Sequence, residues 1–487
     1  MRQDHLARFR DRLKLLLFGW IVRICDAAGA YGPLSRICAR YVCRIADGRR
    51  AALDDLAAGD ARVTVLVLDY DRFRGDIDIL SRSPELRFLV VSWNLPRMLL
   101  RAFVDLPTAR EEAQLPPGRI ARIVFSQAEP ESRTGRQRER YRAFLRKFLP
   151  VFLGGLNVDV VMNSDFRYRR EMDLVRVASE CGFAHICYYR EAMYIVSANY
   201  KLAVERHHAL RPFHGDIIAV QNEITRKMFI ESGIAPADRI VIRGCPRMDG
   251  LVEKLRSRQA KASGMRQIAY FSCPGGAQLE DLRYFDFFST TRQVIRVLAE
   301  LAIEDPELRV VIKMKDMHIA AQLDAIRQEL NVANGGNGVP ANVEVELGRM
   351  AAQNVIRDSD VVCGMQSTVV LEAGVTGKPV ILPHFKTMRE AEGADQVLMY
   401  KEYGYLFDVA DDAEALKALF LARLDNPVVP DDVVSQRRQL FEEHVSSLEG
   451  GAVRRSVQLI KETAKRRRMR SVERQQAHAA VGDAAQV

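Results

Sequence analysis

The sequence lacks the marks of several protein classes. Its 30 glycines and 18 prolines are too few for a collagen-like or low-complexity chain of 487 residues. Its eight cysteines form no C-x-x-C pair and have no histidine cluster beside them, so we expect reduced, mostly buried thiols rather than a disulfide framework or a zinc site. Neither a G-x-x-x-x-G-K-[ST] phosphate loop nor a G-x-S-x-G nucleophile elbow is present. The composition is that of an ordinary globular protein in a reducing compartment.

A membrane-spanning run is also absent near the N-terminus. The stretch Leu15–Ile24 contains Arg23 and is shorter than the roughly 20 apolar residues of a spanning helix. No A-x-A cleavage pattern follows it with the polar spacing that is usual in secretory signals. Apolar residues instead recur at three- and four-residue steps, which predicts an amphipathic helix. They are Leu6, Phe9, Leu13, Leu16, Leu17, Trp20 and Ile24. Such a helix either lies in the headgroup layer of a membrane or docks on the protein's own body.

Positive charge is concentrated at the two ends of the chain. The total is +9, whereas residues 1–50 carry +7 (11 basic, 4 acidic) and residues 461–474 carry +5 (7 basic, 2 acidic), which leaves −3 for the rest. A basic groove for nucleic acid through the body is therefore not expected, and we expect no nucleic-acid partner. The basic ends favour contact with an anionic surface such as a lipid leaflet.

Short apolar runs alternate with amphipathic stretches from residue 62 onward, as in parallel α/β sheets. The first series of predicted strands is Val63–Leu68, Phe88–Val91, Ile120–Phe125, Val158–Met162, Ala184–Tyr188 and Asp216–Val220. The second series is Ile268–Ser272, Val310–Lys313, Val343–Leu347, Val361–Gly364 and Pro379–Leu382. We therefore predict an α/β fold in which two Rossmann-like, doubly wound domains face each other across a cleft.

The expected domain boundaries follow from these series and from the charge distribution. A basic amphipathic helical extension covers residues 1–50, the first Rossmann-like domain 51–250, a charged connection 251–267, the second Rossmann-like domain 268–460, and a basic, disordered tail 461–487.

The segment 358–383 carries the most chemical information. It indicates a strand, a short loop, a helix and a Gly-Lys-Pro turn into the next strand. Gln366, Ser367 and Thr368 would then lie where a strand ends and a helix begins, where backbone N–H groups and the helix dipole favour a phosphate. Glu372, one turn later, can accept hydrogen bonds from ribose hydroxyls. The alternative is that Ser367 and Thr368 only cap the helix.

This segment, SDVVCGMQSTVVLEAGVTGKPVILP, resembles the donor-nucleotide segment of GT-B fold glycosyltransferases, in particular bacterial surface and capsular polysaccharide transferases and CDP-glycerol glycerophosphotransferases. Val241–Asp249 resembles the junction that closes the first domain in this group and in UDP-GlcNAc 2-epimerase relatives. The resemblance covers roughly residues 215–460 and implies that the second domain binds a nucleotide-activated donor and the first an acceptor. In such proteins the final helix often crosses back to the first domain.

The sequence departs from the pattern of this group at one strand end. Where many members carry Lys-x-His-Pro, this chain has Lys313 followed by Lys315 and Asp316. A lysine can replace the histidine electrostatically at a pyrophosphate, so we assign Lys313 and Lys315 to the donor site together with Ser272 at the end of strand 268–272. A solvated strand end is the alternative for the two lysines.

The acceptor hydroxyl needs a base, which the resemblance places on the first domain. Glu191 and Asp165 follow two predicted strands directly and are the candidates for this catalytic role, although each could instead pair with its neighbouring arginine. Arg247, at the expected hinge, could reach a phosphate. We expect no cofactor and no metal, because helix N-termini and basic side chains can neutralise the departing nucleotide phosphate.

Two further patterns are given structural interpretations. Asp69-Tyr-Asp71 has the D-x-D form of a metal motif, but it directly follows the first strand of the first domain and we do not expect metal there. The run Arg136–Arg142 could bind phosphate, but its alternating charges are more typical of a solvated helix.

These observations predict an enzyme, a nucleotide-sugar-dependent glycosyltransferase or polyol-phosphate transferase that builds a cell-surface polysaccharide such as a capsule. Its partners would be a nucleotide sugar donor, a glycan or lipid-linked acceptor and an anionic membrane surface. Its location would be cytoplasmic and peripheral on the inner face of the cell membrane. The alternatives are a nucleotide-sugar epimerase or hydrolase of the same fold, and a non-catalytic assembly protein that retains the fold.

Overall fold

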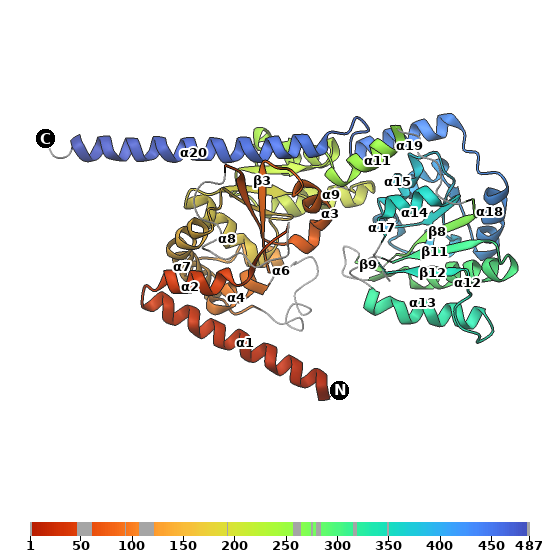
Figure 1. The fold of residues 1–487 in the computed structure, drawn as a ribbon, viewed down its shortest axis with the longest axis horizontal. Helices are drawn as coiled ribbons and strands as arrows, with labels where there is room; N and C mark the ends of the chain where they lie inside the picture. The colour runs from red at the N-terminus through yellow and green to blue at the C-terminus, as the bar shows by residue number, and fades with distance from the viewer. Residues whose placement is uncertain are drawn as a thin grey trace. The chain divides into compact units, whose positions relative to one another are not determined.

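The computed structural model divides into two compact units (Figure 1). It describes residues 2–45, 61–92, 94–106, 121–191, 193–256, 264–273, 276–278, 284–314, 319–347 and 350–484. Unit 1 consists of Met1–Ala192, Val204–Arg247 and Gly451–Val487, and unit 2 of Met193–Ala203 and Met248–Gly450. The chain therefore contributes a short segment, 193–203, to unit 2, returns to unit 1, builds the rest of unit 2 and ends in unit 1.

Unit 1 is built on a seven-stranded sheet in the order β1-β3-β2-β4-β5-β6-β7, parallel except for β1, which runs antiparallel to β3. The strands are β1 (Val42–Arg44), β2 (Val63–Val67), β3 (Leu86–Val91), β4 (Val160–Asn163), β5 (Ala184–Tyr188), β6 (Ile217–Val220) and β7 (Ile240–Ile242). The central strands are buried along their whole length, which is why they appear in the sequence as continuous apolar runs.

Helices cover this sheet. They are α1 (Arg2–Ala27), α2 (Tyr31–Ala39), α3 (Tyr70–Leu80), α4 (Asn94–Phe103), α6 (Ala121–Ser126), α7 (Arg133–Gly155), α8 (Arg169–Glu180), α10 (Glu223–Ser232) and α20 (Ala452–Ala484). A 3₁₀ turn covers Ala237–Arg239, and the helices α9 (Ser197–His208) and α11 (Pro246–Arg256) span the boundaries between the units.

Unit 2 contains a six-stranded parallel sheet in the order β12-β11-β8-β13-β14-β15 and a small hairpin of β9 and β10. Its strands are β8 (Gln267–Phe271), β9 (Gly276–Gln278), β10 (Tyr284–Asp286), β11 (Arg309–Lys313), β12 (Val343–Glu346), β13 (Val361–Gly364), β14 (Val380–Leu382) and β15 (Asp408–Val409). Its helices are α12 (Phe288–Glu304), α13 (Ile319–Ala333), α14 (Ala352–Asp358), α15 (Val369–Gly374), α16 (Lys386–Arg389), α17 (Ala394–Val397), the 3₁₀ helix Lys401–Leu406, α18 (Ala413–Asp425) and α19 (Asp431–His444). The predicted α/β class with two Rossmann-like domains is confirmed.

Three local predictions differ from the structure. The apolar run Ile120–Phe125 was predicted as a strand, but its described residues 121–125 belong to the helix α6, which packs against α8. A run this short carries too little periodicity to distinguish a strand from a buried helix. The tail 461–487, expected to be disordered, belongs largely to the helix α20, and the expected connection 251–267 begins with the last turns of α11.

Helix α20 packs on unit 1 through its first half. Val457, Leu459 and Ile460 are buried in the same core cluster as the strands β2, β4 and β5. Ser456 is hydrogen-bonded to the hydroxyl of Tyr188 (2.8 Å), and Arg468 donates to Asp159 (3.1 Å). The basic cluster near residue 465 is therefore partly used in ion pairs within unit 1.

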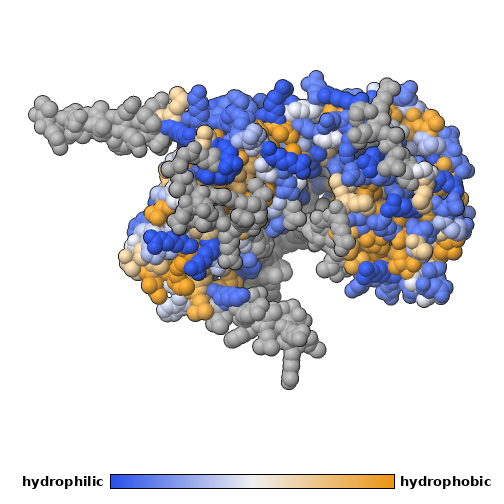
Figure 2. All heavy atoms as spheres, viewed as in Figure 1, coloured by the Kyte–Doolittle hydropathy of each residue, from blue (hydrophilic) through white to orange (hydrophobic). Residues whose placement is uncertain are grey.

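Helix α1 has one buried and one exposed apolar face. Phe18 and Val22 are buried in the unit 1 core, and α1 packs on α2 and α4. Leu16, Leu17, Trp20, Ile21 and Ile24 lie exposed, with 40–65% of their surface accessible. Hydrophobic surface gathers at this end of unit 1 (Figure 2). The side chains of Leu6, Phe9 and Leu13 lie outside the described residues. No helix in the described part of the chain is long and apolar enough to cross a membrane.

Candidate functional site

The strand order of unit 2 places a topological switch point between β8 and β13, since the chain crosses from β8 to β11 on one side and later to β13 on the other. Ligands of open α/β sheets bind outside the carboxyl ends of the strands at such a point. Phe271 of β8 pairs in register with Gly364 of β13. Ser272 and the loop 365–368 therefore leave the sheet side by side, and the structure brings together these parts of the predicted donor site.

Ser367 and Thr368 close the loop onto α15. The hydroxyl of Ser367 accepts a hydrogen bond from the backbone N–H of Val369 (3.3 Å), and that of Thr368 donates to Glu372 (3.1 Å). Both side chains are half-buried. The capping alternative therefore describes a real contact of Ser367, although a hydroxyl oxygen that accepts one bond keeps its own O–H for another acceptor.

Gln366 is used to hold the loop in place. Its side-chain amide donates to the carbonyl of Val397 (2.7 Å) and accepts from the N–H of Met399 (3.0 Å). A third hydrogen bond joins the same two segments: the hydroxyl of Tyr400 donates to the backbone carbonyl of Ser367 (2.6 Å). The segment 397–400 thus anchors the loop, and Gln366 acts as a positioning group.

Glu372 is buried and held on both oxygens. Besides Thr368, it accepts a hydrogen bond from the amide of Gln353 on α14 (2.8 Å). Its carboxylate lies one helical turn from the loop, as expected from the sequence. By accepting the hydrogen bond from Thr368, it fixes the orientation of that hydroxyl.

Lys313 is neither a solvated strand end nor an isolated cation. It forms an ion pair with Glu346 (2.6 Å), and the side chains are 11% and 3% exposed. Glu346 also accepts from the N–H of Met350 (2.9 Å). The pair joins the ends of β11 and β12, which are in register at these two residues. Lys315 and Asp316 lie outside the described residues.

Two buried polar atoms at this edge have no hydrogen-bond partner among the described residues: the hydroxyl oxygen of Ser272 and Nε2 of His384. His384 follows β14 and is 1% exposed. Burial and the nearby charge of Arg389 lower its pKa to about 4, so its ring is neutral at pH 7. The sequence analysis did not identify His384, although its place directly after the strand 380–382 was a usable signal. Unpartnered buried polar atoms are uncommon and mark places where a ligand can supply the missing bond.

Unit 1 has its own switch point, between β2 and β4. Asp69 lies just beyond β2 and Ser164 just beyond β4, and Asp69 accepts hydrogen bonds from the N–H of Ser164 (2.9 Å) and from its hydroxyl. Burial raises the pKa of Asp69 to about 6, even though both bonds from Ser164 lower it. Glu171, fully buried nearby, has a pKa raised well above its usual value by burial and by the charge of Asp69.

The predicted base Asp165 lies in this cluster but is held by Arg167. Burial alone would raise its pKa, yet the charge and hydrogen bonds of Arg167 outweigh this effect and lower it. The guanidinium Nε lies 2.8 Å from both oxygens of Asp165. The ion-pair alternative for Asp165 is thus the contact that the structure contains.

Glu191 and Arg247 occupy more open positions. The exposed carboxylate of Glu191 lies 3.5 Å from Arg190. Arg247 is bound to the buried Asp76, through its backbone N–H (3.1 Å) and its guanidinium (3.2 Å). Arg247 is therefore tied to α3.

The two carboxylates of the D-x-D pattern have different surroundings. Asp69 is buried, whereas Asp71 is exposed in the first turn of α3. Among the described residues, no group of three or more His, Cys, Asp or Glu is arranged to hold a metal ion. All eight cysteines lie in this part of the chain, and none is in a disulfide.

No protein-family model and no curated protein sequence matches this chain. Solved structures similar to it include the wall teichoic acid polymerase TagF with CDPG (13% identity over 95% of this chain and 98% of that one, TM-score 0.48). Others are a UDP-GlcNAc 2-epimerase from Neisseria meningitidis bound to UDP-GlcNAc (11%, 82% and 99%, 0.43) and a glycosyltransferase from Rickettsia africae (11%, 83% and 99%, 0.42). With identities this low and TM-scores below 0.5, a function must be assigned from the residues of this chain.

Proposed function

We propose that this protein is a transferase that moves a sugar or a polyol phosphate from a nucleotide-activated donor onto a growing surface glycan. The observation that carries the proposal is the group of hydroxyls at the switch point of unit 2. Ser272, with an unpartnered buried oxygen, leaves the sheet beside the loop that carries Ser367 and Thr368. Hydroxyl donors and backbone N–H groups at this edge suit the phosphates of a donor.

In the proposed transfer, the donor site must bind the nucleotide and stabilise the negative charge that develops on it. As the bond to the donor phosphate breaks, negative charge grows on the departing nucleotide and must be stabilised by preorganised donors. The Ser367–Thr368 loop is preorganised, because Gln366 and Tyr400 fix its backbone from the side of segment 397–400. Lys313, already neutralised by Glu346, would contribute orientation more than net charge.

The acceptor hydroxyl must lose a proton to a group on unit 1. Asp165 is a weak candidate because Arg167 lowers its pKa. Asp69, with a pKa near 6, has the proton affinity that a general base needs close to neutral pH. Glu191 is the accessible alternative. We propose Asp69 as the base, positioned by Ser164.

Calorimetry with the paired variant Ser367→Ala/Thr368→Ala tests the donor site. We expect donor nucleotides to lose their binding heat while the thermal melt is kept, because both side chains are half-buried and neither fills the core. A screen of CMP, CDP, UDP and GDP by thermal shift selects the nucleotide first, since a ligand of the native state raises its stability. Unaltered affinity of the paired variant for every nucleotide would overturn the assignment.

An acceptor-free assay separates the rival functions. An epimerase or hydrolase converts the nucleotide sugar alone, whereas a transferase needs the acceptor. Donor binding without turnover across a panel of acceptors would instead identify a non-catalytic assembly protein.

We also propose that the exposed face of α1 attaches the protein to an anionic membrane surface, at the cytoplasmic leaflet. Five large apolar side chains form this face, and they are Leu16, Leu17, Trp20, Ile21 and Ile24. Exposed basic residues accompany this face: Lys14 and Arg23 on α1, Arg36 on α2, and Arg40 directly after α2. An apolar face with a tryptophan and flanking cations has the composition of an interfacial helix.

A further inference from the structure

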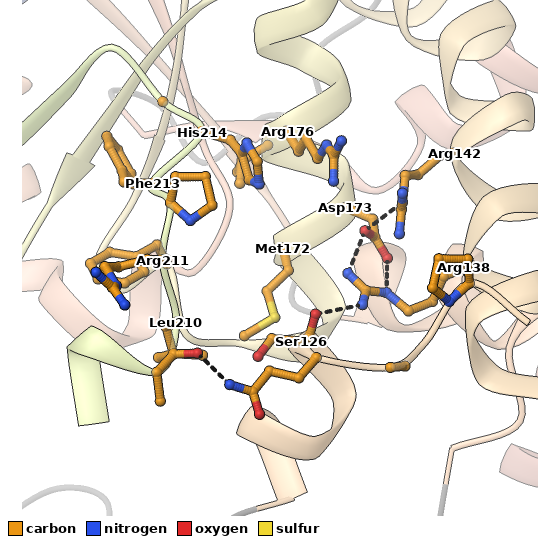
Figure 3. Close-up of a pocket in the computed structure, with 18 residues that line it drawn as sticks. Ser126, Arg138, Arg142, Met172, Asp173, Arg176, Leu210, Arg211, Phe213 and His214 are labelled. Atoms are coloured by element: carbon orange, nitrogen blue, oxygen red, sulfur yellow. Dashed lines mark hydrogen bonds and ion pairs between the residues drawn. The ribbon is translucent and has the colours of Figure 1, made fainter. Parts of the chain in front are cut away.

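Unit 1 contains a cavity of about 300 Å³ that the proposed transfer reaction does not use. It lies between the segment 126–130, the helices α7 and α8, and the loop 209–215 (Figure 3). Its apolar wall includes Phe166, Met172, Leu210 and Phe213. The side-chain amide of Gln127 donates to the carbonyl of Ala209 (3.0 Å), which ties two of these segments together at the cavity.

Positive charge surrounds this apolar wall. Of the described residues that line the cavity, four are arginines and one is a carboxylate, which leaves a surplus of three positive charges with His214 neutral. The arginines are Arg138, Arg142, Arg176 and Arg211. Two of them come from the run Arg136–Arg142, which the sequence indicated as a solvated helix. In the structure Arg138 is buried and the side chain of Arg142 is only 15% exposed.

Arg138 and Asp173 neutralise each other. Arg138 donates to both oxygens of Asp173 (2.8 and 2.9 Å) and to the carbonyl of Phe125 (2.6 Å). Arg142 shares one oxygen of Asp173 (3.0 Å) and reaches the exposed Glu139 (2.9 Å). Arg142 therefore shares Asp173 with Arg138, and its other carboxylate partner, Glu139, is exposed. A ligand's acid group would replace this exposed contact, which contributes little.

Arg176 and His214 lie beside one another at one side of the cavity (Figure 3). Arg176 pairs with Glu180 at the surface (3.0 Å), a contact that contributes little and is easily exchanged. A second hollow of about 260 Å³ is lined by both residues together with Ser179, Glu180 and Arg467. Burial lowers the pKa of His214, and the charges of Arg176 and Arg142 lower it further, whereas Glu180 and Asp173 raise it.

We propose that this cavity binds a small amphiphilic anion. The acid group, a phosphate or a carboxylate, would lie between Arg142, Arg176 and His214, and a short apolar body would pack on Met172, Leu210 and Phe213. Apolar walls with a few convergent charged groups, at this volume, are the general form of a small-molecule site. The proposal does not depend on the transferase function, because none of these residues belongs to the donor loop or to the Asp69 cluster.

Calorimetry on the full chain tests the proposal with hexyl phosphate, hexanoate, inorganic phosphate and hexanol as probes. We expect hexyl phosphate or hexanoate to bind at least tenfold more tightly than inorganic phosphate and hexanol, and the stronger of the two identifies the acid group. Equal affinity for inorganic phosphate and hexyl phosphate would reduce the site to a surface anion contact and overturn the proposal, as would no binding of any probe.

Three variants locate the binding in the cavity. Arg142→Gln/Arg176→Gln should weaken the preferred probe at least tenfold, and it leaves Asp173 paired with Arg138. Met172→Trp should block the apolar part with every charge in place. Arg146→Gln is the matched control, because Arg146 is exposed on α7 and also pairs with Glu180, but does not line the cavity. An equal loss with Arg146→Gln, or unchanged binding in Met172→Trp, would contradict the assignment.

Discussion

At the scale of single residues, the pKa of Asp69 gives the sharpest test of the acceptor side. If Asp69 is the base, it must be unprotonated, so kcat/KM should fall as pH drops through about 6. Ser164→Ala removes a hydrogen bond that lowers this pKa and should therefore move the acidic limb of the profile to higher pH. Asp69→Asn should lose turnover by about two orders of magnitude or more.

The control for this prediction is the rival carboxylate. Glu191→Gln should leave the pH profile in place, since Glu191 is exposed and contacts only Arg190 among the ion pairs of the described residues. Loss of turnover in Glu191→Gln, with an unshifted profile in Ser164→Ala, would assign the base to Glu191 instead.

Variants of the buried ion pair between Lys313 and Glu346 can distinguish a role of Lys313 in stability from a role in donor binding. Lys313→Met leaves Glu346 buried without its cation and should lower the free energy of unfolding by about 3 kcal/mol in urea titrations. Lys313→Met/Glu346→Gln removes both charges and should regain most of that loss. If Lys313 also contacts a donor phosphate, the paired variant should bind nucleotide more weakly despite its restored stability. Full affinity in the stable paired variant would show that Lys313 is structural.

The residues also show what the sequence could and could not predict. The positions of Ser272, Ser367 and Thr368 at strand ends follow from apolar runs that local periodicity reveals. The bond between Asp69 and Ser164 does not, because it joins residues 95 positions apart through the pairing of β2 with β4. The same holds for Lys313, whose partner depends on which strand lies beside β11.

At the scale of elements, the described part of α1 docks on the protein, which was one of the two predicted alternatives, and it leaves an exposed apolar face for the proposed membrane contact. Phe18 and Val22 are buried in the core of unit 1, whereas Trp20 and the other residues of the exposed face of α1 are accessible to solvent. The sequence could not show this division, since nearly every position from 15 to 24 is apolar. Deleting the helix would therefore uncover core residues, and substitutions on its exposed face test membrane attachment better.

Leu17→Glu/Trp20→Glu should reduce binding to vesicles containing phosphatidylglycerol at least tenfold in cosedimentation. Each lost apolar contact is worth roughly 1.5–3 kcal/mol, and tenfold corresponds to about 1.4 kcal/mol. The melt should be unchanged, because both side chains are more than half exposed. Leu421→Glu, an exposed leucine of α18, is the matched control and should bind as the wild type does. Binding by the double variant equal to that of the control would exclude the α1 face.

In helix α7 the sequence prediction missed the burial of a charged residue. Alternating charges from Arg136 to Arg142 indicated a solvated face, yet Arg138 is 6% exposed and bound to Asp173 of α8. A single carboxylate 35 residues away is enough to bury an arginine, because the pair is bidentate and the remaining donors reach backbone carbonyls. Sequence periodicity records neither of these partners.

At the scale of the whole molecule, the chain returns to unit 1 after building unit 2. The first half of α20 therefore belongs to the hydrophobic core of unit 1. Truncation after Gly450 removes Val457, Leu459 and Ile460, which are buried among β2, β4 and β5. At roughly 1.5–3 kcal/mol for each side chain, the loss approaches the total stability of an ordinary domain. We expect hydrogen exchange to rise strongly in β2, β4 and β5, while β8, β11 and β13 of unit 2 keep their protection. Truncation after Arg474 keeps Val457, Leu459 and Ile460 and should leave both units protected. Equal loss in the two units, or full protection of β4 after the longer truncation, would show that α20 does not hold unit 1 together.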